Sequence, residues 1–287
     1  MSRRLLSLTF LMLATSTSAI AAQEFDWRAH EGKTVHFLAN SNPIGKLLID
    51  HEAEFEELTG IDLVIDGYQE QQMRQRLMTV MNARSDEVDV FMTLPSREGM
   101  QFAKAGWYRD LTPYMQQVAP DYNAQGLAPA LVEAATFDGQ LIGVPLNIEG
   151  PLLYYRTDIF EECGLDAATS LDEIRADAEK LKECSDITPF ASRGLAAAVP
   201  YTFAGFMHNM GGSYMADGQS AMCSQPVKDA LSLYAGLLRD YGPPGAVNYS
   251  FQQLTALYRA GRSAMSFQSS NEFSGVMEGG DRLEDTA

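Results

Sequence analysis

Short apolar runs alternate with amphipathic segments along the first half of the chain. Three runs have the length and residue types of strands: "KTVHFLA" (33–39), "IDLVIDG" (61–67) and "VDVFMTLP" (88–95). Segments 44–60 and 70–84 place their apolar residues at helical spacing and therefore predict two helices. The third run is apolar without alternation, so we expect a strand that is buried on both faces.

The sequence also indicates where the first predicted helix begins and ends, and which residues of both helices are apolar at helical spacing. Asn42 is suited to cap the first helix, Pro43 to occupy its first turn and Gly60 to end it. The positions at helical spacing in this helix are Leu47, Leu48, His51, Phe55 and Leu58. The second helix has a core-facing stripe that consists of Met73, Leu77, Val80 and Met81.

This alternation of strands and helices predicts a parallel sheet. Ligands of such sheets bind beyond the carboxyl ends of the strands. In this chain those ends are residues 39–42, Gly67–Tyr68 and residues 94–98, and all three are polar or turn-forming. Each one could be an ordinary loop, and their coincidence modestly favours a binding cleft.

A second α/β unit follows a turn at Asp138–Gly139 and an extended segment. Helical spacing recurs over 169–184, 227–242 and 251–261, and the run "SAMSFQSS" (263–270) predicts a strand after the last helix. We therefore expect an α/β protein with two lobes, an N-terminal lobe over 23–143 and a C-terminal lobe over 144–287.

The first residues have the features of a cleaved signal peptide. Arg3 and Arg4 precede an apolar run, and small residues follow up to Ala22. The run is shorter than the ~20 apolar residues that span a bilayer as a helix. We expect residues 1–22 to be removed after Ala21 or Ala22, and the protein to be periplasmic.

The chain is strongly acidic, with a formal net charge of −17 at pH 7. This charge argues against binding to nucleic acid or to anionic lipid, because both partners attract concentrated positive charge. An acidic, solvated surface suits a soluble exported protein.

Three cysteines remain after the predicted cleavage: Cys163, Cys184 and Cys223. One pair could form a disulfide in an oxidising compartment. Cys163 and Cys184 lie near opposite ends of a predicted helix that spans about 20 Å at 1.5 Å per residue. A disulfide joins Cα atoms only ~6 Å apart, so this pair is the least favoured, and three buried free thiols are the simplest expectation.

Known catalytic and metal-binding motifs are absent from the sequence. It has no phosphate-binding glycine loop, no nucleophile elbow and no zinc motif, and its four histidines are scattered. Glu149, an acid in an apolar and proline-interrupted segment, leaves open an acid-pair glycosidase with a second acid. The adjacent Tyr154–Tyr155 would suit Fe(III), but a strand whose aromatics alternate between faces is favoured. We expect no metal and no cofactor.

Six phrases occur in order along the chain: "LANSNPIGKLLIDHEAEFEELTGIDLVID", "VDVFMTLP", "AKAGWYRDLTPYM", "GVPLNIEGPLLYYRTDIFEECGLD", "NMGGSYM" and "GRSAMSF". Together they resemble the extracellular solute-binding proteins of family 1, the sugar-binding components of bacterial ABC importers, which include the maltose-binding proteins. The resemblance covers residues 33–278. It implies a type II periplasmic-binding-protein fold whose two lobes close over the ligand.

The resemblance also implies that the fold is incomplete at the C-terminus. In the family the chain crosses back to the N-terminal lobe after the "AMSF" strand, whereas this chain stops at Ala287. A lobe without that second crossover would expose apolar surface and a sheet edge.

The resemblance implies individual ligand-binding residues, and some of them have an alternative structural role. Asn42 could instead be only a helix cap, Ser96 and Arg97 a surface loop, and Glu149 a hinge carboxylate. Tyr201 matches a stacking aromatic, whereas Phe203 and Phe206 are expected in the core. The complete set implied is Asn40, Ser41, Asn42, Ser96, Arg97, Glu149, Tyr201, Gln268 and Asn271.

These observations favour a monomeric periplasmic binding protein that captures a sugar or sugar alcohol for an ABC-transporter permease and is not an enzyme. Two alternatives stay open at this point. One is an exported carbohydrate-active enzyme that uses Glu149, and the other is an inactive, truncated binding-protein fragment.

Overall fold

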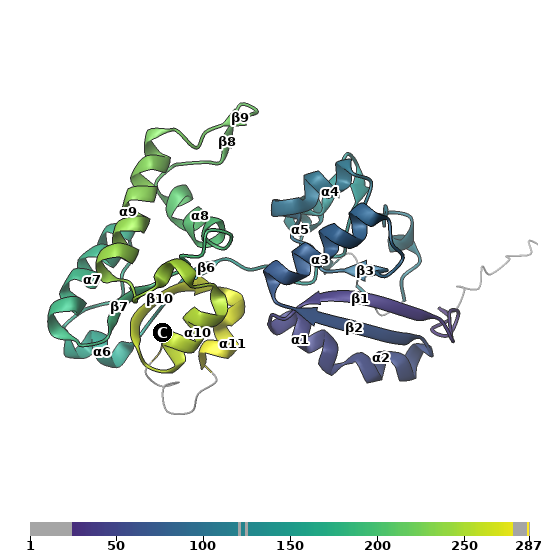
Figure 1. Cartoon of the computed structure of the whole chain (residues 1–287), viewed down its shortest axis with the longest axis horizontal. Coiled ribbons are helices and arrows are strands. Elements are labelled where there is room, and N and C mark those ends of the chain that lie inside the picture. Colours follow the sequence, from purple (N-terminus) through teal and green to yellow (C-terminus); the bar gives the residue numbers. More distant parts are fainter. Residues whose placement is uncertain (1–24, 120–121, 124–125, 278–285, 287) are drawn as a thin grey trace, which may run out of the picture.

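The computed structural model describes residues 25–119, 122–123, 126–277 and 286, so the predicted signal peptide (1–22) lies outside the described residues. Two α/β lobes lie side by side, and the connecting residues 143–150 contain no helix or strand (Figure 1). Within the described ranges, no helix is long and apolar enough to cross a membrane.

The N-terminal lobe contains the predicted parallel sheet, in the order β2-β1-β3. Strand β1 pairs along its whole length with β2, from Thr34 opposite Asp62 to Asn40 opposite Tyr68. The strands of this lobe are β1 (Thr34–Asn40), β2 (Asp62–Tyr68), β3 (Val90–Phe91) and the hairpin of β4 (Thr136–Phe137) and β5 (Gln140–Leu141). Its helices are α1 (Pro43–Asp50), α2 (Glu52–Thr59), α3 (Glu70–Ala83), α4 (Met100–Lys104) and α5 (Pro129–Ala134), with the short π-helix η1 (Pro95–Gly99) and the short 3-10 helix η2 (Tyr114–Gln116).

Helix α3 covers the sheet with the predicted apolar stripe. Met73, Leu77 and Val80 are buried, and Met81 packs at the edge of the cluster that Leu38 and Phe102 complete. Each fully buried side chain of this size contributes about 1.5–3 kcal/mol relative to an exposed one. The stripe therefore fixes α3 against β1 and aims the N-terminus of the helix at the carboxyl end of the sheet.

Two predictions for this lobe were wrong in detail. Residues 44–60 form two helices, because His51 leaves the helical conformation (φ −105°, ψ 7°) and separates α1 from α2. Strand β3 has only two residues, and its Val90 is 46% exposed rather than buried on both faces. The reason is that β3 lies at the edge of the sheet, where β1 is its one partner among the described strands.

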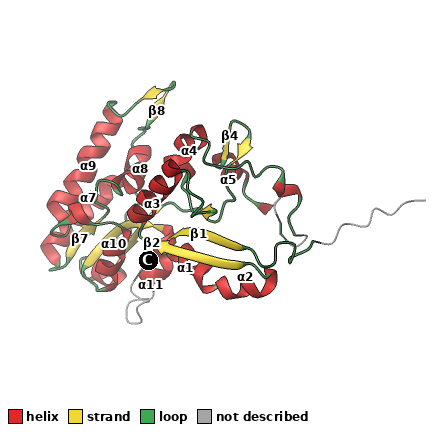
Figure 2. Cartoon of the chain, turned by 45° about the vertical axis from the view of Figure 1, so that its right-hand side comes forward, coloured by secondary structure: helices red, strands yellow, loops and turns green. Residues whose placement is uncertain are grey.

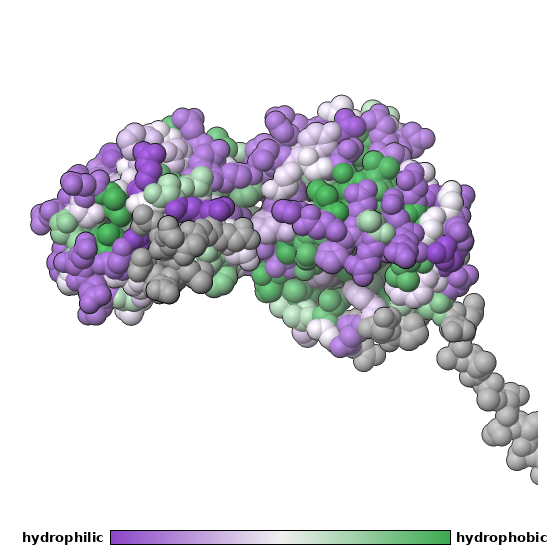
Figure 3. All heavy atoms as spheres, turned by 90° about the horizontal axis from the view of Figure 1, so that it is seen from below, coloured by the Kyte–Doolittle hydropathy of each residue, from purple (hydrophilic) through white to green (hydrophobic). Residues whose placement is uncertain are grey.

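Apolar side chains are exposed on the helices of this lobe. On α1 and α2, Leu47 is 52% exposed and Leu58 is 46% exposed. Figure 3, which views the molecule from below, shows hydrophobic side chains at the surface of this lobe. These positions have helical spacing, but no described residue buries them.

The C-terminal lobe contains a mixed sheet in the order β6-β10-β7. Figure 2 shows the helices in red and the strands in yellow. Strand β10 is antiparallel to β6 and parallel to β7. The strands are β6 (Pro151–Tyr155), β7 (Thr188–Ala191), β10 (Ser263–Ser269) and the hairpin of β8 (Met215–Ala216) and β9 (Gln219–Ser220). The helices are α6 (Thr157–Glu162), α7 (Leu171–Cys184), α8 (Val199–Asn209), α9 (Gln225–Tyr241), α10 (Phe251–Arg259) and α11 (Phe273–Met277), with short turns η4 (Ala246–Asn248) and η5 (Ser270–Glu272).

The core of this lobe surrounds β10, every residue of which is buried. Phe203 and Phe206 lie in the core, as predicted. Tyr154 packs with Tyr258 on one face of the sheet, and Tyr155 packs against the main cluster of the other face. The predicted alternation is confirmed, and two side chains on opposite faces cannot bind one iron ion together.

The cysteine prediction was wrong. Cys163 and Cys184 form a disulfide with Cα atoms 5.9 Å apart, and Cys223 is free and exposed. Cys163 follows α6, whereas α7 starts only at Leu171, so the two cysteines do not share a helix. The intervening loop returns along α7, where Lys180 donates a hydrogen bond to the carbonyl of Gly164. The chain thereby brings Cys163 back to the end of α7.

Candidate functional site

The site candidates of the C-terminal lobe gather at one edge of its sheet. Because β7 and β10 are parallel, their carboxyl ends share this edge, and the antiparallel β6 begins there. Gly150, the last residue of the connecting segment, exchanges hydrogen bonds with Ser270: its N–H donates to Oγ over 3.2 Å, and its carbonyl accepts from the N–H over 2.8 Å. Parallel strand ends are where ligands of α/β proteins bind.

The two hydrogen bonds between Gly150 and Ser270 place the preceding residue, Glu149, beside Ser269. The hydroxyl of Ser269 donates to Glu149 Oε2 over 2.5 Å, and Ser269 Oγ also accepts from the N–H of Asn271 over 3.1 Å. Glu149 as a whole is exposed, and none of the hydrogen bonds between described residues uses its Oε1. One carboxylate oxygen is therefore fixed and the other is available as an acceptor.

Arg193 lies at the same edge and was missed by the sequence analysis. It follows β7, and its backbone carbonyl accepts a hydrogen bond from the Tyr234 hydroxyl over 2.6 Å. The residue is only 7% exposed. Its Nε and Nη2 both donate to Gln268 Oε1, over 3.2 and 3.1 Å. Burial lowers the pKa of the guanidinium, and Tyr201 and nearby carboxylates act in the opposite direction.

Gln268 lies behind Arg193. It is fully buried, its Oε1 also accepts from the N–H of Ser269 over 2.9 Å, and its Nε2 donates to the carbonyl of Phe251 over 3.1 Å. With both ends of its amide occupied, Gln268 holds the arginine. A single sequence could not have revealed this pairing, since the two residues are 75 positions apart.

Tyr201 supports the other side of the guanidinium. The guanidinium carbon lies 4.3 Å from the centre of the tyrosine ring, within the range of a cation–π contact. Burial raises the pKa of the Tyr201 hydroxyl to about 12. This hydroxyl is enclosed and lacks a hydrogen bond of good geometry to any described residue, although Ser269 is next to it.

A second acid, Glu272, lies buried beneath this edge. Its carboxylate accepts from the Thr255 hydroxyl over 2.8 Å. Burial raises its pKa, and the charge of Glu149 adds to that effect. Asn271, the predicted neighbour, is half-buried. The edge thus combines one buried cation with two nearby acids.

In the N-terminal lobe, Asn40 is the last residue of β1, and Ser41 and Asn42 follow the strand. Asn42 is the predicted helix cap, because its Oδ1 accepts from the N–H of Gly45 over 2.8 Å. Asn40 Oδ1 is enclosed and has no hydrogen-bond partner among the described residues. Gly45 is required here, since an added Cβ would lie 1.7 Å from the carbonyl oxygen of Asn40.

The loop after β3 carries Ser96 and Arg97, which are both exposed. Arg97 Nη1 donates to Glu70 Oε1 over 3.1 Å, and Arg74 donates to the same oxygen over 3.2 Å. Arg74 also pairs with the buried Glu98. This ion-pair network connects the start of α3 to the loop after β3.

The two lobes meet at these edges. Gln252 Nε2, at the start of α10, donates to Gln69 Oε1, which follows β2. Glu70 also lies close enough to act on the charge of Arg193. The carboxyl ends of the N-terminal strands therefore face the edge that holds Arg193, Tyr201 and Glu149.

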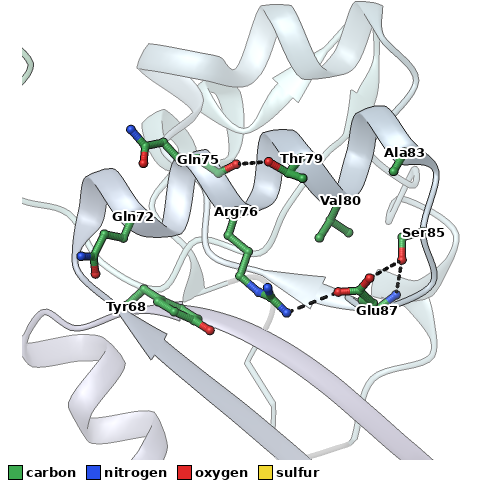
Figure 4. A pocket seen from close by; sticks show the side chains of 9 residues that line it. All are labelled: Tyr68, Gln72, Gln75, Arg76, Thr79, Val80, Ala83, Ser85 and Glu87. Carbon is green, nitrogen blue, oxygen red and sulfur yellow. Dashed lines mark hydrogen bonds and ion pairs between the residues drawn. The ribbon is translucent and has the colours of Figure 1, made fainter.

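One groove of the described surface lies away from these residues. It has a volume of about 690 Å³ and runs between α3 and the end of β2 (Figure 4). Arg76 crosses it, with its guanidinium 5.9 Å from the ring centre of Tyr68 and 3.3 Å from Glu87. None of the nine predicted ligand residues lines this groove.

Comparisons with known proteins agree with this architecture. The family profile described as bacterial extracellular solute-binding protein matches residues 43–281. A mannitol-binding protein of Pseudomonas aeruginosa is 28% identical over 205 residues, 69% of this chain and 45% of the relative. An erythritol/L-threitol-binding protein of Mycolicibacterium smegmatis is 26% identical over 153 residues, 49% of this chain and 32% of the relative. The chain thus spans less than half the length of these two curated relatives.

Solved structures show the same fold. An ABC transporter solute-binding protein of Agrobacterium radiobacter K84, in complex with ribitol, matches with a TM-score of 0.80 and 22% identity over 90% of this chain and 66% of that one. Another from Agrobacterium vitis S4, with bound D-mannitol, matches with a TM-score of 0.78 and 22% identity over 89% and 63%. The two-lobed fold of type II periplasmic binding proteins, predicted from the sequence, is confirmed by these matches.

Proposed function

The chain belongs to the bacterial extracellular solute-binding proteins, and on that basis we propose that it captures a sugar or a sugar alcohol between its two lobes for an ABC importer. Its action is binding without chemical conversion of the ligand. The partner is the membrane permease, which reads the closed form. The protein acts as a monomer in the periplasm after removal of residues 1–22.

The main support is the set of groups at the edge of the C-terminal sheet. A fixed carboxylate, a buried guanidinium and an aromatic ring lie together at Glu149, Arg193 and Tyr201. Sites for polyhydroxy ligands combine planar polar groups, which bind paired hydroxyls, with aromatic faces that cover the apolar side of the ligand. The relatives and structural neighbours named above bind mannitol, erythritol, L-threitol and ribitol.

The N-terminal lobe supplies the opposing groups in this proposal. Asn40 Oδ1 has no hydrogen-bond partner among the described residues but is enclosed, and Ser41 and Ser96 are exposed at the same end of the sheet. Asn42 and Arg97 already have partners in α1 and Glu70, so their contribution to ligand contact is smaller. Asn271 completes the C-terminal side, and Gln268 acts through Arg193.

A thermal-shift screen tests the proposal. The purified chain is heated with mannitol, ribitol, erythritol, maltose and further sugars, each at millimolar concentration. A ligand at 100 times its Kd stabilises the folded state by about 2.7 kcal/mol, which is readily visible as a higher Tm. Absence of any shift, together with no heat of binding by calorimetry, would contradict the proposal.

An assay for turnover separates binding from catalysis. The protein is incubated with oligosaccharides, and the mixture is analysed for new reducing ends. We expect none, because Glu149 accepts a hydrogen bond from Ser269, and the neighbouring acid Glu272 is buried and accepts a hydrogen bond from Thr255. Steady release of product would instead favour the carbohydrate-active enzyme.

A further inference from the structure

We propose that Arg193 contacts the ligand directly, and that Arg193 and Glu149 together select uncharged polyhydroxy compounds over their carboxylate or phosphate forms. This inference rests on the proposed function and adds the chemical class of the ligand. It also adds a residue that no sequence motif indicated.

The first step is the state of the arginine. A buried charge is normally paired, since an unpaired ion loses its hydration without compensation. Within the described part of the chain no carboxylate pairs directly with Arg193, whose only hydrogen-bond acceptor there is the neutral amide oxygen of Gln268. By contrast, the other buried arginine of this lobe, Arg156, pairs with Asp158. The guanidinium of Arg193 can therefore donate further hydrogen bonds to a ligand.

The second step is its orientation. Gln268 takes Nε and Nη2, and the ring of Tyr201 covers one face of the guanidinium. The remaining nitrogen, Nη1, makes no hydrogen bond to a described residue. Because Gln268 and Tyr201 fix the guanidinium, its remaining N–H groups donate in a fixed direction. Only a ligand with a hydroxyl oxygen in that direction can accept the hydrogen bond.

The third step is the charge of the surroundings. Three carboxylates, those of Glu70, Glu149 and Glu272, act on Arg193 from nearby without touching it. A ligand with its own negative charge would meet Glu149 and Glu272 along with the arginine. A neutral hydroxyl pair can accept from Arg193 and donate to the free oxygen of Glu149, so both protein groups are satisfied and no repulsion arises.

Isothermal titration calorimetry with matched ligands tests this inference. The probes are the uncharged D-mannitol, ribitol and erythritol, and the corresponding acids D-mannonate, D-ribonate and erythronate. The same titrations are made with Arg193→Lys, Arg193→Gln and Glu149→Gln. The control is Arg156→Lys, a buried arginine at the opposite end of β6 that is paired with Asp158.

We expect the unmodified chain to bind at least one of the uncharged probes about tenfold more tightly than its acid. Arg193→Lys keeps the positive charge but loses the planar guanidinium with its several N–H donors. It should weaken binding of the polyol by about tenfold or more, which is typical of losing a charge-assisted hydrogen bond. Arg156→Lys should leave the affinity unchanged even if it lowers the Tm. Glu149→Gln should reduce the preference for the polyol over its acid at least threefold, because it removes the repulsion of the acid.

The outcomes separate the two proposals. If the unmodified chain binds none of the probes or other sugars, the proposed function fails. If it binds a polyol while Arg193→Lys binds equally well, Arg193 does not contact the ligand. If it prefers the acid, the selection is opposite to the one proposed. Should the Arg193 variants fail to fold, Glu149→Gln decides, because Glu149 is exposed and its replacement leaves the core intact.

Discussion

Glu272 is a buried acid whose titration should be visible in the stability of the protein. Burial raises its pKa above the ordinary value of 4.5, so the folded state binds a proton more tightly than the unfolded state does. The resulting stabilisation is fully present below pH 4.5 and is lost as the pH rises through the raised pKa.

Glu272→Gln should therefore be more stable than the unmodified chain above that window. The amide oxygen keeps the hydrogen bond from Thr255, and the neutral side chain removes the penalty of a buried charge. Urea unfolding at several pH values from 4 to 8 measures the difference between the two proteins. A difference that stays constant over this range would show that Glu272 does not titrate there.

At the residue scale, the sequence predicted some residues of the candidate site and missed others. Glu149 and Tyr201 were predicted from the family pattern, and both lie at the edge that the fold assembles. Arg193 was missed because its environment consists of Gln268 and Tyr201, which only the folded chain brings together. A lone arginine after a short strand looks like any surface residue in a sequence.

The cap of helix α1 distinguishes a structural role from a binding role at Asn42. Its Oδ1 accepts from the N–H of Gly45, so Asn42→Ala should lower the free energy of unfolding by about 1 kcal/mol. Asn42→Ser preserves the cap and should restore most of that stability. Ligand affinity, measured by calorimetry, should be close to normal in Asn42→Ser; a loss there, with stability retained, would show that the amide itself contacts the ligand.

The disulfide at the end of α7 should stabilise the C-terminal lobe. Cys163 and Cys184 are separated by 21 positions, and closing a loop of this length contributes about 3 kcal/mol in the chain-entropy account. We expect reduction with dithiothreitol, or the Cys163→Ser variant, to lower the urea midpoint. Cys223→Ser, which changes an exposed free thiol, is the control and should leave the midpoint unchanged. An equal midpoint in oxidised and reduced protein would contradict this expectation.

At the element scale, periodicity predicted those helices and strands whose two sides differ. Helix α7 buries Ile174, Ala178 and Leu181 as its spacing indicated. The predictions of helices and strands were wrong where contacts with neighbouring elements determine the structure. Strand β3 has an apolar sequence but lies at a sheet edge, and His51 interrupts a helix whose spacing is continuous. The path of a loop, which pairs Cys163 with Cys184, is set by packing and leaves no periodic signal.

For the whole molecule, the sequence predicted two α/β lobes and an extended connection. It did not predict how the lobes face each other, because that arrangement depends on few contacts. Gln252 donates to Gln69 between the lobes, and Ser269 holds Glu149 at the connection. Such a sparse set of polar contacts is compatible with relative motion of the lobes.

Because few polar contacts join the two lobes, the shape of the protein should change when a ligand binds between them. If the ligand binds to both edges, it adds contacts that exist only when the lobes are close, and it shifts the population toward the closed form. We expect small-angle X-ray scattering to show a smaller radius of gyration with a saturating polyol than without it. Arg193→Gln, measured with the same polyol, should show no such decrease. Binding by calorimetry without any change in the radius of gyration would place the ligand on one lobe alone, and the capture between lobes would then be wrong.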